Sequence, residues 1–205
     1  MEQIAKDRYN GTLKKGELSD EYILENYKEL NGAMWEGFGK DNFRVHKQTG
    51  AISPEVLQMQ RNLYKFSGAK NYVLLQQINE ILRSDKGKNW QTFLQEVQKL
   101  NPKYNKNYLQ AEWQTAKQAG YHAANWQEYI SMKDIYPNLK YMTVKDNKVR
   151  ESHQLLDSFI APIDSNFWKV CYPPNGWRCR CYVVQTAEPA STGDMPQLSD
   201  KDFPK

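Results

Sequence analysis

Residues 149–184 read VRESHQLLDSFIAPIDSNFWKVCYPPNGWRCRCYVV, and this stretch decides what the C-terminal part of the chain can form. It holds all 3 cysteines of the chain, one of its 3 histidines and two of its 6 tryptophans. Residues 173–176, Pro-Pro-Asn-Gly, join two stiff residues to one that tolerates a positive φ, which predicts a tight turn. The chemically reactive side chains of the protein are therefore concentrated around this turn.

The segment Cys179–Val184 is rich in β-branched and aromatic residues, which predicts a strand. Residues two apart on a strand point to the same face, so the sulfur atoms of Cys179 and Cys181 should lie side by side. Such close neighbours rarely form a disulfide, because disulfide geometry is demanding. Together with His153 and Cys171, the pair is an allowed ligand set for tetrahedral zinc. The alternative is three reduced, buried thiols, and the sequence leaves both interpretations open.

His153 lies in a short segment, residues 152–157, that predicts one or two helical turns capped by Ser152. His153 and Asp157 are four residues apart, which places them on one face of such a helix. The carboxylate would then orient the imidazole of a metal ligand, or the pair would only stabilise the turn. Nucleophilic catalysis by a cysteine and His153 has little support, because nothing in the sequence indicates an oxyanion hole.

The composition describes a polar protein of 205 residues with a formal net charge of +4 and a hydrophobic content of 40%. The mean hydropathy is -0.85 and the sequence pI is about 8.8, so weak contact with DNA is permitted although dense basic stripes are lacking. The N-terminus has no apolar stretch of signal-peptide length, and no window predicts a transmembrane helix. An odd number of cysteines argues against a disulfide framework and favours a reducing, intracellular setting.

Helical periodicity dominates the first two thirds of the chain. Residues 1–17 are polar and lysine-rich and predict a frayed arm, and a helix is predicted from Ser19-Asp20 to about Met34, where Gly37 and Gly39 interrupt the pattern. Further helices are predicted from Ser53-Pro54 to Leu82, with Gly68 as a candidate break, and over 90–100 and 104–131. His122 lies on the small-residue stripe of the last helix, which favours a hydrogen-bonded histidine over a metal ligand.

After Pro137 the pattern changes to one typical of strands. Residues 139–144 alternate, residues 145–148 predict a turn, and Val149-Arg150 should return as the second arm of a hairpin. We therefore predict an α+β protein with a helical region over 1–136 and a small antiparallel module over 137–186 packed on the helix 104–131. Residues 187–205 have the composition of a linker or tail.

Several short motifs follow one another between Tyr141 and Val184. They are Tyr141-x-Thr-Val-x-Asp146, Val149-Arg150-x-x-His153-x-x-Leu156-Asp157, Pro162-Ile-Asp164, Phe167-Trp168, Tyr172-Pro-Pro-Asn-Gly-Trp177 and Cys179-Arg-Cys181. In this order they resemble the phage Mu F-like head morphogenesis family of minor head proteins. Two positions depart from the family pattern. Cys171 stands where a variable residue is expected, and Ser158 replaces the glycine that usually follows the Leu-Asp pair.

The resemblance implies a minor capsid component of a phage or prophage, present in few copies near the portal and needed for head assembly or DNA delivery. Its expected partners are the portal and other capsid proteins, with weak DNA contact and no membrane. The expected location is the virion, and the host cytoplasm during assembly. His153, Cys179 and Cys181 match the histidine and Cys-x-Cys positions of the family, where a shared metal role is a hypothesis.

Two functions from other classes compete with this one. A zinc-dependent hydrolase or nuclease-like effector would use His153, Cys179 and Cys181 as ligands and leave the fourth position to water. It would also need a general base, for which Asp157 and Asp164 are the nearby carboxylates in sequence. A DNA-binding protein would need a contiguous basic face, which the dispersed lysines and arginines do not predict.

Overall fold

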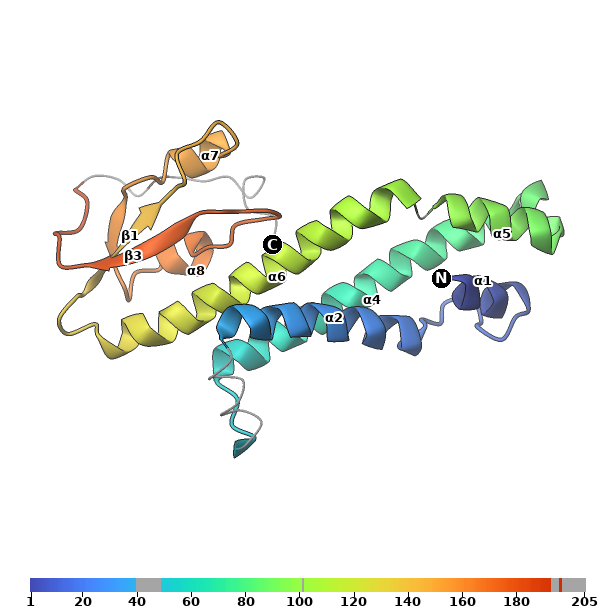
Figure 1. The fold of residues 1–205 in the computed structure, drawn as a ribbon, viewed down its shortest axis with the longest axis horizontal. Coiled ribbons are helices and arrows are strands. Elements are labelled where there is room, and N and C mark those ends of the chain that lie inside the picture. The colour runs from blue at the N-terminus through green and yellow to red at the C-terminus, as the bar shows by residue number, and fades with distance from the viewer. Residues whose placement is uncertain (40–48, 101, 193–195, 197–205) are drawn as a thin grey trace. The chain divides into compact units, whose positions relative to one another are not determined.

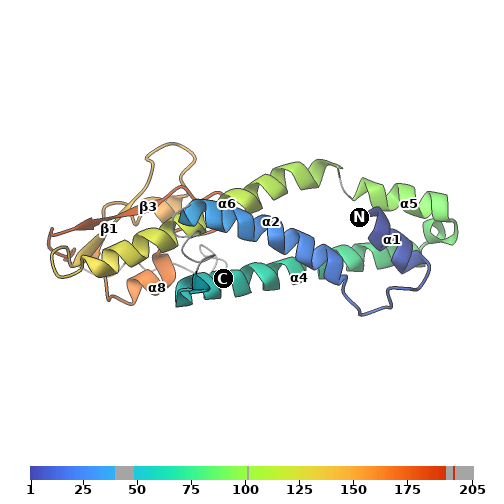
Figure 2. The ribbon, with the colours of Figure 1, turned by 60° about the horizontal axis from the view of Figure 1, so that its bottom comes forward.

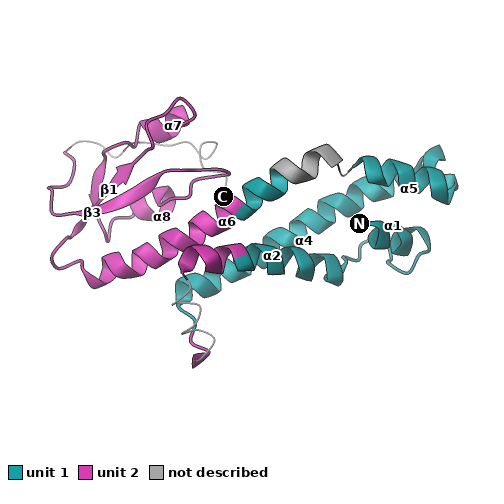
Figure 3. Ribbon diagram, viewed as in Figure 1, with its two compact units in different colours: residues 1–32, 52–113 teal, residues 33–51, 114–205 magenta. Residues whose placement is uncertain are grey.

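The computed structural model of the protein describes residues 1–39, 49–100, 102–192 and 196 (Figure 1). Helices form the N-terminal part, and a three-stranded antiparallel sheet lies in the C-terminal part, which confirms the predicted α+β class. Two compact units are distinguished in Figure 3: unit 1 comprises residues 1–32 and 52–113, and unit 2 comprises residues 33–51 and 114–205. None of the described helices is both long and apolar enough to span a membrane.

Unit 1 is helical, and side-chain caps mark the starts of two of its helices. It contains α1 (Glu2–Tyr9), α4 (Pro54–Arg83), the 3-10 helix η1 (Asp85–Lys88), α5 (Trp90–Lys99), and parts of α2 (Asp20–Phe38) and α6 (Pro102–Ser131). The hydroxyl of Ser53 accepts a hydrogen bond from the amide of Val56 at 3.3 Å, with Pro54 in the first turn. These caps confirm the predicted starts of α4 and α5, the second of which is capped by Asn89.

Helices α2 and α4 run antiparallel within unit 1 (Figure 2). Near the start of α2, the amide of Ser19 donates to Oδ1 of Asn71 at 2.8 Å, and further along α2, Gln60 donates to Oδ1 of Asn31 at 3.2 Å. A partly buried ion pair, Lys70 to Glu112 at 2.7 Å, joins α4 to the part of α6 in the same unit. Polar contacts therefore fix the register of helices whose apolar stripes alone would permit sliding.

Two expectations for this region are wrong. Residues 2–9 form α1 rather than a frayed arm, because Ile4 and Ala5 are buried in the core of unit 1. That core also includes Leu74, Leu75, Ile78, Phe93 and Val97. Gly68 does not divide α4, which runs without interruption through it. A mid-helix glycine costs about 1 kcal/mol relative to alanine, which the buried apolar stripe of a 30-residue helix readily offsets.

The sheet of unit 2 has the strand order β2-β1-β3, and both strand pairs are antiparallel. Its strands are β1 (Asn138–Met142), β2 (Ile160–Pro162) and β3 (Tyr182–Thr186). The predicted strand after Pro137 is therefore confirmed, but the hairpin return at Val149-Arg150 is wrong. Asp146, in the expected hairpin turn, instead forms a two-bonded ion pair with Arg180 at 2.6 and 2.8 Å. Pairing between distant segments has displaced the local hairpin.

One face of the sheet carries the core of unit 2, because β1 and β3 alternate buried and more exposed side chains. Leu139, Tyr141 and Val183 point into this core, and Trp126 and Tyr129 of α6 pack against it. Figure 1 shows the sheet beside the yellow end of α6. The hydroxyl of Tyr129 also donates to the carbonyl of Val183 at 2.9 Å. The C-terminal end of α6 thus belongs to the same unit as the sheet.

The segment after β3 stays attached to the sheet as far as Ser191. Asn138 donates to the carbonyl of Glu188 at 2.8 Å, and the carboxylate of Glu188 forms an ion pair with Lys140. Ser191 forms two hydrogen bonds with the backbone of Ile160, each 2.9 Å long. Most of the remainder of the predicted tail, residues 187–205, lies outside the described residues.

A close helix contact in unit 2 brings the end of α2 against α6 at two glycines. A Cβ atom added to Gly37 would lie 1.8 Å from the carbonyl oxygen of Lys117, and one added to Gly120 would lie 1.9 Å from that of Met34. Both obstacles are helix backbone, which cannot move aside as a side chain can. Gly37 was expected to end its helix, but α2 continues through it to Phe38, because the residue is needed for this close approach.

We predict that Gly37→Ala or Gly120→Ala lowers the free energy of unfolding by about 3 kcal/mol through this steric overlap. Gly32→Ala is the matched control, since Gly32 lies in the same helix with nothing near its Cβ position. This control should stabilise the protein by about 0.5–1 kcal/mol through helix propensity. Urea unfolding of the three variants measures both effects, and equal destabilisation of all three would contradict the close-packing argument.

The turn after Asp157 predicts a second stability effect. Ser158 has a φ of 67°, in the left-handed region that favours glycine, while its amide donates to the carbonyl of Tyr141 at 2.7 Å. Ser158→Gly removes the Cβ strain and keeps the backbone hydrogen bond. We expect a gain of about 0.5–1 kcal/mol, measured as a rise in Tm. Ser158→Ala, which keeps the Cβ, should bring no gain, and a lower Tm for the glycine variant would refute the prediction.

Candidate metal centre

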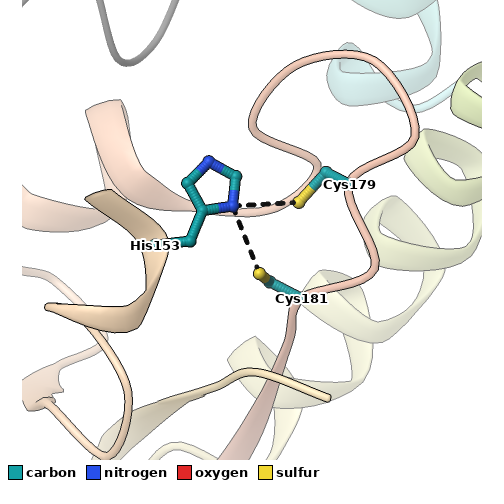
Figure 4. Close-up of side chains that lie close together, drawn as sticks. All are labelled: His153, Cys179 and Cys181. Carbon is teal, nitrogen blue, oxygen red and sulfur yellow. Dashed lines mark hydrogen bonds between the residues drawn. The ribbon is translucent and has the colours of Figure 1, made fainter. Parts of the chain in front are cut away.

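Three of the four ligands predicted from the sequence meet in unit 2, as Figure 4 shows. His153 is in the short helix α7 (Glu151–Gln154), while Cys179 and Cys181 lie just before β3. Nδ1 of His153 is 3.8 Å from the sulfur of Cys179 and 3.4 Å from that of Cys181. The three side chains are buried, and their donor atoms all lie within 4.8 Å of one another. They form a group that could hold a metal ion.

The spacing of these atoms suits a tetrahedral ion. Zinc bonds of about 2.3 Å to sulfur and about 2.0 Å to nitrogen, at a tetrahedral angle, separate nitrogen and sulfur by roughly 3.5 Å. The two observed nitrogen–sulfur distances, 3.8 and 3.4 Å, lie on either side of that value. Small side-chain movements would therefore bring all three atoms into bonding distance of one ion.

The two cysteines share a site that favours one thiolate. The pKa of Cys179 is lowered, chiefly because the Cys181 thiol donates a hydrogen bond to its sulfur, and His153 adds to the effect against the cost of burial. The backbone amides of Asn175 and Cys181 also hydrogen-bond to this sulfur. The neighbouring thiolate, together with burial, raises the pKa of Cys181. A thiolate is the metal-binding form of cysteine, so the pair is prepared for a cation that replaces the shared proton.

Tyr141 and Asn175 hold the cysteine loop from inside the core. Burial raises the pKa of Tyr141, so its hydroxyl stays protonated and forms a hydrogen bond with Cys181. The side-chain amide of Asn175 donates to the Tyr141 hydroxyl at 3.3 Å and to the carbonyl of Cys171 at 2.7 Å. The sequence marks Asn175 as a turn residue and Tyr141 as part of a predicted strand and of a family motif. Their contact with the cysteines depends on a strand pairing that the sequence does not reveal.

Arg150 holds the same loop from the surface. Its guanidinium donates to the carbonyls of Asn175 and Trp177 at 3.3 and 2.6 Å. Gly176 has a φ of 86°, which confirms that the Pro-Pro-Asn-Gly segment uses its glycine for a positive φ. The loop before Cys179 is therefore held by hydrogen bonds both from the core and from the surface.

Helix α6 supports the centre through His122. This histidine is buried, which lowers its pKa, and it hydrogen-bonds to the backbone of Cys181. Its own carbonyl accepts a hydrogen bond from the hydroxyl of Tyr172 at 2.8 Å. The prediction that His122 is a hydrogen-bonded packing residue is confirmed. Its side chain supports the backbone of the cysteine pair.

The remaining predicted residues lie elsewhere. Cys171 ends helix α8 (Phe167–Cys171) within the sheet core, outside the group of three, and burial raises the pKa of its thiol to about 11. The carboxylate of Asp157 accepts two hydrogen bonds of 2.8 Å from Thr143, and that of Asp164 pairs with Lys133 at 2.8 Å. Each of these side chains therefore has contacts away from the group.

Three local predictions are corrected. Helix α7 begins at Glu151 with Arg150 as its N-cap, so Ser152 is not the cap. The helix ends at Gln154, so the same-face argument for His153 and Asp157 does not apply. The strand predicted from Cys179 begins only at Tyr182. The two sulfur atoms nevertheless face one histidine, because the turn before them curves back towards α7 (Figure 4).

Comparison with known proteins adds three findings. A "Putative capsid assembly protein F" from Escherichia phage Mu is 38% identical over 63 residues, which are 31% of this chain and 14% of that protein. A "Mu-like prophage FluMu F protein" from Haemophilus influenzae is 35% identical over 88 residues, 43% of this chain and 21% of that protein. The chain thus spans about a fifth or less of these relatives. No solved structure matches it.

The family model described as phage Mu protein F like protein matches residues 77–184, more than half of the chain. The matched region contains β1, α7, the turn at residues 173–176 and the His-Cys-Cys group, and it ends within β3. The resemblance drawn from the motifs between Tyr141 and Cys181 is thereby confirmed. The chain belongs to the phage Mu protein F like family.

Proposed function

We propose that this protein is a minor structural component of a phage or prophage head, where it contacts the portal and other capsid proteins during assembly. The observation that carries the proposal is the family match over residues 77–184, joined to the name of the phage Mu relative, a capsid assembly protein. The protein acts in the host cytoplasm during assembly and stays in the virion. Its net charge of +4 supports a weak, salt-sensitive contact with packaged DNA.

The surroundings of the His-Cys-Cys group favour this structural role over the hydrolase or nuclease alternative. A zinc hydrolase needs a general base within hydrogen-bond reach of the metal-bound water. Asp157 is engaged by Thr143 and lies 3.4 Å from the ammonium of Lys145, and Asp164 pairs with Lys133 at the surface. These contacts favour structural roles for both carboxylates: Asp157 holds a turn, and Asp164 forms a surface ion pair.

Deletion of the gene from an inducible prophage tests the assembly role. We expect induced cells to lack infectious particles and DNA-filled heads in electron micrographs, and a plasmid copy of the gene to restore both. Mass spectrometry of purified wild-type heads should detect the protein in few copies, cross-linked to the portal. Normal yields of infectious particles from the deletion strain would rule the role out.

We further propose that the group binds zinc, with His153, Cys179 and Cys181 as protein ligands. Nitrogen–sulfur distances near those of a tetrahedral site and a lowered thiol pKa support this assignment. The ion would join α7 to the loop before β3, contacts that otherwise depend on a few hydrogen bonds. Zinc would thus stabilise the module that carries the family motifs.

Elemental mass spectrometry of protein purified without added zinc measures this directly. We expect about one zinc per chain in the wild type, and loss of the zinc in Cys179→Ser and Cys181→Ser. Cys171→Ala is the control and should keep its zinc, because Cys171 is outside the group. Removing the ion with a chelator should lower the Tm. A metal-free wild type that also fails to take up added zinc would refute the assignment.

A further inference from the structure

The three donor atoms leave a tetrahedral ion one ligand short. Zinc in proteins is almost always four-coordinate, and a site with three protein ligands completes its shell with a small molecule. The remaining cysteine lies outside the group, and the contacts of Asp157 and Asp164 are with Thr143, Lys145 and Lys133. Within the part of the chain that the structure describes, the metal-ligand group has three members, so a fourth ligand from solution would complete the shell if there is room for it.

A small cavity beside the three ligands supplies that room. Its volume is about 20 Å³, enough for one water-sized ligand, since a single water needs about 10–15 Å³ measured in this way. Its lining comprises the three ligand residues together with Val144, Lys148, Val149, Arg150, Arg178 and Arg180. The ligand residues are buried, while the four basic residues are exposed, so the cavity has a buried floor and a solvent-facing rim.

The charge around the cavity favours an anion. A zinc ion with two thiolates and a neutral imidazole has no net charge, whereas the cavity lining carries four basic side chains. Asp146 pairs with Arg180 at 2.6 Å and therefore offsets one of these positive charges. Both Arg150 and Arg180 interact electrostatically with the cysteine sulfurs, which places their charges close to the metal position.

We propose that the metal held by His153, Cys179 and Cys181 keeps one exchangeable coordination position in this cavity, and that it takes a small anion such as hydroxide or a halide. The inference rests on the proposed zinc site and extends it. Ligand exchange at this position involves no redox change: the entering anion forms one bond to the metal as the previous ligand leaves. The centre is thereby a receptor for single small anions at the surface of the motif module.

Cobalt substitution tests the proposal, because the visible spectrum of four-coordinate Co²⁺ reports each ligand. Azide, a small anion, is titrated into the cobalt-loaded full chain, with perchlorate at equal ionic strength as the non-coordinating control. We expect a saturable spectral change with azide and none with perchlorate. X-ray absorption of the zinc form should show two sulfur ligands. A spectrum unaffected by azide, or a third sulfur ligand, would overturn the proposal.

Two variants isolate the basic rim. Lys148→Gln removes one positive charge and should weaken azide binding roughly threefold, whereas Lys148→Arg keeps the charge and should bind as the wild type does. Equal affinity in all three proteins would refute the anion preference.

Cys171→Ala should leave the cobalt spectrum unchanged. Failure to bind cobalt or zinc at all would refute the zinc site itself, which distinguishes that outcome from an unresponsive but metal-loaded protein.

Discussion

The convergence of two cysteine sulfurs on one imidazole nitrogen is the contact on which unit 2 depends. It joins residues 26 and 28 positions apart in the sequence, and it lies where α7, the loop of residues 173–176 and the start of β3 meet. A buried imidazole and a buried thiolate each need hydrogen-bond partners for their polar atoms. Tyr141, Asn175 and His122 supply some of these partners, so core, turn and helix are all organised around the same three side chains.

Local signals were sufficient to predict α4, α5 and α6, but not α1 or the pairing of the strands. The caps at Ser53 and Asn89 and the periodicity of α6 depend on residues within one or two turns, so they can be recognised in the sequence. The hairpin at Val149 was an equally reasonable local prediction, yet β1 pairs with strands that begin at Ile160 and Tyr182. Strand pairing is decided by packing between distant segments, which no short pattern encodes.

The candidate site was predictable by residue type and not by arrangement. A Cys-x-Cys pair and a histidine indicate metal binding through their chemistry, and the structure brings these three together. Cys171 shows the limit of that reasoning, because a cysteine near the others in sequence can still point into an apolar core. Gly37 shows a similar limit: one residue type serves both to end helices and to let two helices touch, and only the neighbouring backbone distinguishes the roles.

The contact between Tyr129 and β3 has a consequence for association between copies. Strand β3 is at one edge of the sheet. The backbone of Val183 faces the open side, because the opposite residue Tyr141 forms its backbone hydrogen bonds with Ser158 and Phe159, just before β2. The carbonyl of Val183 accepts a hydrogen bond from the hydroxyl of Tyr129. The side-chain amide of Gln185 donates to the carbonyls of Tyr129 and Tyr136. An exposed edge would template strand addition at the high local concentrations of an assembling particle. Contacts from Tyr129 of α6 and from Gln185 therefore hinder strand addition at the β3 edge of the sheet.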